Sequence, residues 1–311
     1  MADIAVIGAG ISGLVAARRL HEAGHVVSVF DKSRGVGGRM ATRRAGDWRF
    51  DHGAQFFTAR GAAFRDFVAA GVREGWAAPW FEDRFVGVPT MNAPAKALAE
   101  GLNVTLGTEI AWLSRASGRW RLSTADAQLT GAFDAVLVAA PAPQAARMIS
   151  TADIDPAPVV GDVTYAPCWT LMLGFGDAPA LPRDHMRRDD GPVAWMARNA
   201  SKPGRPVGEA VVVHAAPDWS REHLEAPGAT VENDMLAAFR DMSGVRAAPA
   251  CSAVHRWRYA MVESAMPSSC WWDADEGLGA CGDGFGGPRV EAAFDSGVAL
   301  ARHVAGALSP R

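Results

Sequence analysis

The sequence feature that most constrains this chain is a glycine-rich turn near its N-terminus. Residues 4–7 are a short apolar run of the kind that forms a strand buried on both faces. The motif GAGISG follows at 8–13, and residues 14–23 have the spacing of a helix. A second apolar run, 26–30, ends at Asp31. Together these elements predict a dinucleotide-binding unit, whereas the glycines alone would also suit a tight structural turn.

Each residue of this unit has an expected role. Gly8 permits the tight turn, Gly10 lets the backbone approach a pyrophosphate at the positive end of the helix, and Gly13 lets helix and strand pack closely. Asp31 follows Gly13 by 18 residues and is placed to accept hydrogen bonds from an adenosine ribose.

The composition argues against several classes of protein. The 311 residues carry a net charge of −3, so no basic field favours nucleic acid or an anionic membrane. The four cysteines show no metal-binding or disulfide spacing, which predicts no metal site and favours the reducing cytoplasm. Asp3 occupies a position where a signal peptide needs positive charge, and no apolar segment reaches the ~18 residues of a membrane span.

Two later loops could run along a bound ligand. In the first, Arg39 follows Gly38 and could reach phosphates or stack on a planar group, or it could be solvated on a flexible loop. The second is DHGAQ at 51–55, whose small Gly-Ala pair suggests backbone packed against something flat. Gln55 could hydrogen-bond a ligand ring, whereas His52 taken alone would more often be a packed or capping residue.

From about residue 151 the pattern changes. Short apolar runs at 169–175, 193–197 and 210–215 alternate with loops rich in proline, glycine and aspartate, and residues 231–242 have helical spacing. This pattern predicts a mostly antiparallel sheet with a helix beside it, which we interpret as a second domain that faces the substrate.

The segment HRWRYA is a strand with alternating aromatic and basic residues. A period of two puts His255, Trp257 and Tyr259 on one face and Arg256 and Arg258 on the other. One face could pack in the core and the other meet solvent, or one face could meet a ligand.

Near the C-terminus a short strand, 278–281, leads through Gly282 and Asp283 into a helix from residue 292 to about residue 308. The glycines here repeat the dinucleotide pattern, but no strand follows the helix to complete a second unit. We expect the helix N-terminus to offer free N–H groups to a ligand, and Asp283 to accept hydrogen bonds from sugar or ribityl hydroxyls.

Taken together, these motifs resemble FAD-containing amine-oxidase-type flavoproteins, and within that group they are most similar to the bacterial renalases. The broader likeness rests on GAGISG, Asp31, GGRM at 37–40, DHGAQ and CGDGFGGPRVEAAF at 281–294. The narrower likeness rests on DHGAQ and on three further segments: AAPAPQAARMI at 139–149, HRWRYA at 255–260 and GDGFGGPRVE at 282–291.

The resemblance implies an α/β fold with a Rossmann-type, glutathione-reductase-like FAD-binding domain and an inserted, mostly antiparallel α+β substrate domain. The FAD-binding domain would be discontinuous, with residues 1–60, 96–150 and 275–311. The substrate domain would take residues 61–95 and 151–274. FAD would be bound non-covalently.

The resemblance also implies which residues line the cofactor, from the pyrophosphate through the ribityl chain to the flavin. The pyrophosphate would lie on residues 8–13, the ribose on Asp31, the adenine against Ile110, and the flavin beside residues 51–55. The implied set is Gly8, Gly10, Ile11, Ser12, Gly13, Asp31, Lys32, Gly38, Arg39, Asp51, His52, Gly53, Ala54, Gln55, Ile110, Gly282, Asp283, Arg289, Val290 and Glu291.

Renalases oxidise isomeric dihydronicotinamides, which are forms of reduced NAD(P) that carry the hydride at the wrong ring carbon. The resemblance therefore implies hydride transfer to flavin N5, then reoxidation by O2 to give NAD(P)⁺ and H2O2. Such a substrate gains aromaticity when it loses hydride, so the protein need supply only position and a dry pocket.

The residues themselves show no convincing base, and no motif matches the lysine that amine oxidases place near the flavin. Gln55, Phe56, Trp257 and Tyr259 are candidates for contacting the substrate ring, and Arg258 for the substrate phosphate. An amine oxidase or desaturase of the same fold, and a flavin-binding protein without turnover, remain alternatives. A reductase with its own nicotinamide domain is disfavoured, because only one complete dinucleotide-binding unit is present.

Overall fold

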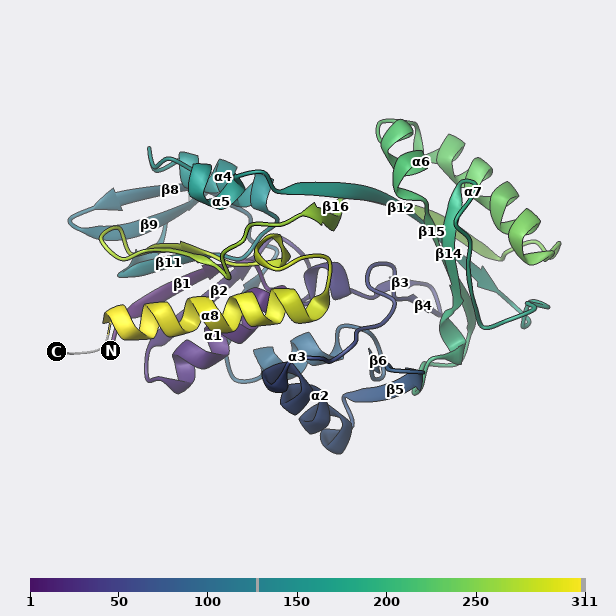
Figure 1. The fold of residues 1–311 in the computed structure, drawn as a ribbon, viewed down its shortest axis with the longest axis horizontal. Helices are drawn as coiled ribbons and strands as arrows, with labels where there is room; N and C mark the ends of the chain where they lie inside the picture. The colour runs from purple at the N-terminus through teal and green to yellow at the C-terminus, as the bar shows by residue number, and fades with distance from the viewer. Residues whose placement is uncertain (127–128, 309–311) are drawn as a thin grey trace.

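A computed structural model describes residues 1–126 and 129–308, and it has two halves joined by long strands (Figure 1). The first half is built on a six-stranded sheet in the order β17-β18-β11-β1-β2-β7, parallel except for β17. Its central strands are apolar because both faces are covered. These strands are β1 (Asp3–Ile7), β2 (Val26–Asp31), β7 (Asn103–Leu106), β11 (Ala135–Val138), β17 (Trp271–Asp273) and β18 (Leu278–Ala280).

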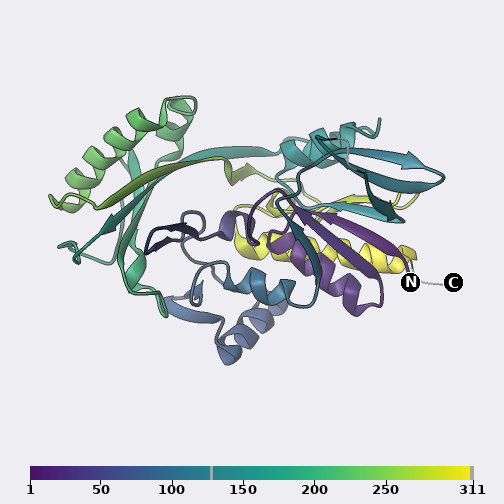
Figure 2. The ribbon, with the colours of Figure 1, turned by 180° about the vertical axis from the view of Figure 1, so that it is seen from behind.

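Two helices from opposite ends of the chain lie side by side on this sheet, as both views show (Figures 1 and 2). They are α1 (Ile11–Glu22) and α8 (Val290–Leu308). A Cβ at Gly297 would lie 2.2 Å from the carbonyl oxygen of Ser12, so the two backbones approach too closely for any other residue there. The N-terminal glycine turn and the C-terminal motif are thereby brought to the same end of the sheet.

The remaining elements of this half cover the sheet and its edge. A three-stranded sheet of β8 (Ile110–Ala116), β9 (Arg119–Thr124) and β10 (Leu129–Phe133) shares a core with Phe30 and Val136. The helices are α3 (Ala93–Ala99), α4 (Ala142–Ser150) and α5 (Ala157–Val160).

The second half is a five-stranded antiparallel sheet in the order β13-β14-β15-β12-β16. One face packs Leu171, Leu173 and Val213 against α7, and the other packs Met172 and Val212 against a hairpin from the first half. The elements are β12 (Thr164–Phe175), β13 (His185–Arg187), β14 (Val193–Arg198), β15 (Glu209–Ala215), β16 (Cys251–Ser264), α6 (Pro217–Glu222), α7 (Gly228–Ser243) and the short 3-10 helix η2 (Asn199–Ser201).

The predicted fold class is confirmed: a Rossmann-type sheet carries an inserted, mostly antiparallel domain. Two elements lie elsewhere than the predicted domain boundaries imply, since those boundaries assign residues 61–95 and 151–274 to the inserted domain. Helix α2 (Ala62–Glu74) packs Phe64 against Phe294 of α8, so it shares the core of the first half. Strand β17 also precedes residue 275, yet it pairs with β18 in the first sheet.

Two hairpins connect the halves. The hairpin of β3 (Arg43–Ala45) and β4 (Trp48–Phe50) lies against the second sheet (Figure 2). There the indole of Trp48 donates to the carbonyl of Phe175. The other is β5 (Ala77–Phe81) with β6 (Arg84–Gly87). Among the described helices, none is long and apolar enough to cross a membrane.

Candidate functional site

The glycine turn has the geometry that a dinucleotide needs. Gly8 has a φ of +114°, and a Cβ there would lie 2.3 Å from the carbonyl oxygen of Ala139. A Cβ at Gly13 would lie 2.1 Å from the carbonyl oxygen of Gly8, whereas a Cβ at Gly10 would meet nothing within 4 Å. Gly8 and Gly13 thus hold the turn together, and Gly10 leaves open space beside the N-terminus of α1.

Asp31, which is predicted to bind the ribose, is hydrogen-bonded to the same turn. Its carboxylate accepts hydrogen bonds from the N–H of Ala9 at 2.7 Å and of Ser33 at 2.7 Å. Ile110, which is predicted to contact the adenine, is buried in the core that includes the end of β2. Lys32 is exposed, and its ammonium lies 3.5 Å from Glu109, so its contact is at the surface and not in the turn.

Arg39 and Asp283 join the two ends of the chain at this site. The short 3-10 helices η1 (Gly38–Met40) and η3 (Asp283–Phe285) place them. The guanidinium donates to the two carboxylate oxygens at 2.6 and 2.7 Å, and also to the carbonyl of Tyr259 at 3.2 Å. Burial opposes the charge on Arg39, but Asp283 raises the pKa of that guanidinium. Burial and Asp283 also raise the pKa of Tyr165 to about 12.

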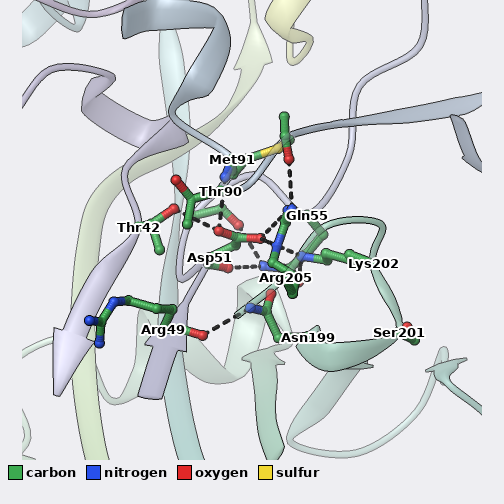
Figure 3. A network of polar contacts seen from close by, with 12 residues as sticks. Thr42, Arg49, Asp51, Gln55, Thr90, Met91, Asn199, Ser201, Lys202 and Arg205 are labelled. Carbon is green, nitrogen blue, oxygen red and sulfur yellow. Dashed lines mark hydrogen bonds and ion pairs between the residues drawn. The ribbon is translucent and has the colours of Figure 1, made fainter. Parts of the chain in front are cut away.

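The carboxylate of Asp51 is enclosed, which corrects the prediction that this side chain lies along the cofactor (Figure 3). Lys202 donates to it at 3.2 Å, Arg205 at 2.6 Å and the Thr42 hydroxyl at 2.6 Å. Burial would raise the pKa of Asp51, but Lys202 and Arg205 lower it to about 2. Asp51 therefore anchors the loop from within, and only the loop backbone and the following residues can meet a ligand.

Lys202 is a functional candidate that the sequence analysis misses. Its side chain is fully buried, and its ammonium lies 3.2 Å from both Asp51 and the Gln55 carbonyl oxygen (Figure 3). Burial lowers the pKa of Lys202 to about 8. The only available signal is that Lys202 is one of three lysines in an arginine-rich chain, and its SKPGR context is typical of a surface loop.

Residues 52–55 face one row of side chains across the second sheet. Thr170 of β12 lies opposite His214 of β15 and His255 of β16, so the three side chains share a face. The Thr170 hydroxyl donates to the carbonyl of His52 at 3.1 Å. The Trp257 indole donates to the same carbonyl at 2.9 Å. The second sheet and the loop after Asp51 therefore meet along this row.

The histidines of this row are held neutral. Burial, then His255 and the cation of Arg43, lower the pKa of His52 to about 4. Burial lowers the pKa of His214 to about 4 as well, and burial and Arg43 lower that of His255. His52 is 7% exposed, and its Nδ1 is buried without a hydrogen-bond partner among the described residues.

The four residues predicted to contact the substrate lie in different environments. The ring of Phe56 packs on Phe81 and Trp195, at centroid distances of 6.1 and 5.8 Å. Trp257 packs on His52 and His255, at 4.9 and 4.3 Å.

Tyr259 does not join this group. Its ring lies 5.7 Å from that of Tyr165, and its hydroxyl accepts from Arg147 at 2.7 Å. It therefore belongs to the Arg39–Asp283 end of the site. The amide nitrogen of Gln55 donates to the carbonyls of Asp51 and Gly53.

Arg258 has a surface partner, which corrects its predicted role at the substrate phosphate. Its guanidinium binds Glu225 at 2.6 Å on the face that also carries Arg256, opposite Trp257. The alternation of the strand is as predicted, but the basic face turns away from the site. Arg43 is an exposed cation whose charge acts on both His52 and His255, and the sequence analysis does not single it out.

The polar groups of the C-terminal motif make contacts within the protein. The N–H of Gly282 donates to the Ser296 hydroxyl at 3.0 Å. One carboxylate oxygen of Glu291, Oε1, accepts from the N–H groups of Arg60 and Gly61 at the start of α2, so this side chain links two helices. Its other oxygen, Oε2, is buried without a hydrogen-bond partner among the described residues. Arg289 is half-exposed, 3.7 Å from Glu291, and Val290 begins α8.

These residues fit FAD. The open backbone at Gly10, the acid at the end of β2 and the buried Arg39–Asp283 pair form one path from the glycine turn to residues 53–55. A Cβ at Gly53 would lie 1.9 Å from the carbonyl oxygen of Arg39, so this part of the path is tightly packed. In the described part of the chain, no cluster of three or more potential ligands could hold a metal ion.

Comparison with known proteins gives the same assignment. The sequence profile of the family described as flavin containing amine oxidoreductase matches residues 80–304, and that of an NAD(P)-binding Rossmann-like domain matches residues 6–70. The 4,4'-diapophytoene desaturase (4,4'-diaponeurosporene-forming) of Staphylococcus aureus (strain Newman) is 40% identical over 75 residues, which cover 21% of this chain and 15% of that protein. The desaturase of the same name from Staphylococcus haemolyticus matches equally.

Solved structures extend the likeness over the whole fold. A protein assigned as a protoporphyrinogen oxidase from Exiguobacterium sp. 255-15 has a TM-score of 0.77 at 12% identity, with 97% of this chain and 98% of that chain covered. A redesigned putrescine oxidase has a TM-score of 0.69 at 13% identity over the same shares of the two chains. At these identities the likeness concerns the fold.

Proposed function

The chain belongs to the flavin containing amine oxidoreductase family and is an FAD-dependent oxidoreductase, and from this premise we propose that it oxidises isomeric dihydronicotinamide dinucleotides. The substrates would be forms of reduced NAD(P) that carry the hydride at the wrong ring carbon. When bound, FAD accepts the hydride and passes the electrons on to O2, and the products are NAD(P)⁺ and H2O2. The proposal deepens the family assignment by naming the substrate class.

The observation that supports it best is the neutral, planar lining of the site. His52, His255 and Trp257 pack on one another beside the loop after Asp51, and both histidines have lowered pKa values. A dihydronicotinamide becomes aromatic as hydride leaves, so no protein group has to remove a proton. Flat neutral rings can hold such a substrate and exclude water.

The charge at the rim suits a dinucleotide. Arg43, exposed next to the histidine row, can bind the pyrophosphate of the substrate, in place of Arg258. This gives the site one apolar, neutral end for the ring and one cationic end for the phosphates.

Amine oxidation is the second candidate, and one observation favours it. Lys202 is a buried lysine close to Gln55. It could therefore take the place of the lysine that amine oxidases have near the flavin, for which the sequence contains no matching motif. Its ammonium, however, already binds Asp51 and the amide oxygen of Gln55. We therefore assign it below to the cofactor environment and not to proton removal.

Anaerobic reduction of the purified FAD-loaded protein tests the proposal. We expect isomeric NADH to bleach the flavin spectrum rapidly, and air to restore it with one H2O2 formed per substrate. A panel of amines and ordinary NADPH serve as comparison substrates. Preferential bleaching by amines would establish the second candidate, and rapid bleaching by NADPH would indicate a reductase. A flavin that none of these compounds reduces would indicate a binding protein without turnover.

A further inference from the structure

An unbalanced positive charge is buried behind residues 53–55. The side chains of Asp51 and Lys202 are 0% exposed and that of Arg205 is 2% exposed. Among the described residues, Asp51 is the only carboxylate that forms an ion pair with either cation. One carboxylate therefore balances two cations, and the cluster carries a net charge of +1. Burying an uncompensated charge is costly, so such a cluster is expected where the charge serves a purpose.

The cluster is connected to the cofactor path by a short chain of hydrogen bonds. Lys202 donates to the carbonyl oxygen of the Gln55 side chain, and the amide nitrogen of Gln55 donates to the carbonyl of Gly53 at 3.0 Å. The N–H of Ala54 in turn donates to the carbonyl of Arg39 at 2.8 Å. Arg39 binds Asp283, so the loop that Lys202 contacts through Gln55 is hydrogen-bonded to the residue that joins the two ends of the chain. Figure 3 shows Lys202 beside Gln55 and Asp51.

Because hydride transfer adds two electrons and one proton to FAD, it adds one negative charge to the cofactor site, while the nicotinamide gains one positive charge. A cation fixed in a dry environment behind the flavin favours that change, since charge near the ring tunes the electronics of a cofactor. Of the two cations, Lys202 is the one that donates to Gln55, whereas the guanidinium of Arg205 donates to Asp51 and to the carbonyls of Gly87, Pro89 and Pro203.

We propose that Lys202 is a positioning residue that fixes Gln55 and whose buried charge makes the flavin easier to reduce. The proposal rests on the placement of FAD along residues 53–55. It does not require Lys202 to touch the substrate or to move a proton during turnover.

The proposal has a pH signature. Burial lowers the pKa of Lys202 to about 8, against the opposing attraction of Asp51. The groups that face its ammonium are Asp51, Arg205, the Gln55 amide, the Trp80 ring at 5.3 Å and the buried His214, which carries no charge near neutral pH. The charge is therefore present at pH 7 and is lost as pH rises through about 8.

The test is the two-electron reduction potential of the FAD-loaded protein, measured by chemical reduction against reference dyes at pH 7 and pH 9. We expect Lys202→Met to lower the equilibrium constant for reduction at least tenfold at pH 7, which is about 30 mV. Lys202→Arg, which keeps the charge but does not titrate in this range, should stay close to the wild type at pH 7. The matched control is Lys96→Met, because Lys96 is exposed on α3.

The comparison between the two pH values distinguishes charge from simple packing. The potential of the wild type should fall between pH 7 and pH 9 by more than that of Lys202→Met or Lys202→Arg. If Lys202→Arg does not fold, the wild type and Lys202→Met still decide the matter. The proposal would be overturned if the equilibrium constant for flavin reduction in Lys202→Met at pH 7 lay within threefold of the wild-type value. It would also be overturned if the potentials of the wild type and Lys202→Met fell equally between pH 7 and pH 9. No dihydronicotinamide is used, so the result is independent of the proposed substrate.

Discussion

Arg39 binds Asp283 through two parallel hydrogen bonds of 2.6 and 2.7 Å, although the two residues are 244 positions apart in the chain. The pair links the loop after β2 to the strand–turn that precedes α8, and both segments have the features of a cofactor cradle. A two-armed arginine–carboxylate pair is geometrically specific, and loss of one partner leaves a buried charge without compensation. The pair thus holds the two ends of the chain together at the place where we propose that FAD binds.

Removal of one partner of this pair should release FAD. We expect Asp283→Asn to weaken FAD binding at least tenfold, and to destabilise the protein by roughly 2 kcal/mol, because the half-buried Arg39 then loses its counter-charge and two charge-assisted hydrogen bonds. Fluorescence titration of the apoprotein with FAD measures the first effect and urea unfolding the second. Arg221→Met is the control, since its ion pairs with Asp218 and Glu263 lie at the surface. Unchanged FAD affinity in Asp283→Asn would contradict the assigned role.

Two glycines of the first turn should respond differently to alanine. Gly10→Ala adds a methyl group that meets no protein atom within 4 Å, at a φ of −78°, which alanine readily adopts. The fold should therefore lose less than about 1 kcal/mol, while FAD affinity should fall at least tenfold, because the methyl group fills the approach of the pyrophosphate. Gly13→Ala forces a Cβ against the carbonyl of Gly8 and should destabilise the fold itself by about 3 kcal/mol. Thermal unfolding with and without FAD distinguishes the two cases, and equal behaviour would show that Gly10 does not face the ligand.

Arg43 and Arg258 form a matched pair for testing phosphate recognition. Arg43→Ala should raise KM for a dihydronicotinamide dinucleotide about tenfold or more, with a smaller effect on kcat, because a charge-assisted hydrogen bond contributes roughly 1.5–3 kcal/mol. Arg258→Ala should change neither constant, because Arg258 binds Glu225 at the surface. A dihydronicotinamide mononucleotide should show a smaller effect of Arg43→Ala than the dinucleotide does. The reverse order, with Arg258 the sensitive residue, would refute the assignment.

The parts of the molecule that are predictable from sequence are those in which the chemistry is local. The first strand, glycine turn, helix and Asp31 follow one another within a single unit, and their spacing defines their geometry. In the same way, period-two alternation correctly groups Arg256 with Arg258 and His255 with Trp257. What alternation could not predict is which face meets the site, because that depends on how the second sheet packs against the first half.

The parts that escape prediction are pairings over long separations. Lys202 lies 151 residues from Asp51, and nothing in its proline- and glycine-containing surroundings indicates that it is buried. His214 comes to the site only because its strand lies opposite Thr170 in the sheet. Glu291 belongs to a motif that the family resemblance links to the cofactor, yet its carboxylate accepts from the start of α2. In each case the partner is supplied by tertiary structure.

The buried histidines predict how stability depends on pH. Burial lowers the pKa values of His52 and His214 to about 4 from an ordinary value of 6.5. Between pH 6.5 and pH 4 the unfolded chain binds more protons than the folded one, so the free energy of unfolding falls as pH falls through this window and levels off below it. Each histidine accounts for roughly 3 kcal/mol, because one pKa unit corresponds to about 1.4 kcal/mol. The window of Asp51, whose pKa is lowered to about 2 from 3.8, lies below that of the histidines.

Replacement of one buried histidine isolates this effect. His214→Gln should reduce the difference in unfolding free energy between pH 7 and pH 4.5 by about 2 kcal/mol, because glutamine does not titrate. Urea unfolding at the two pH values measures it on the apoprotein, where FAD binding does not contribute. His303→Gln is the control, since His303 is exposed on α8 and should leave the difference unchanged. If His214→Gln keeps the full pH dependence of the wild type, then the pKa of His214 is the same in the folded and the unfolded protein, burial does not hold this imidazole neutral, and the row of neutral side chains along residues 52–55 has to be reassigned.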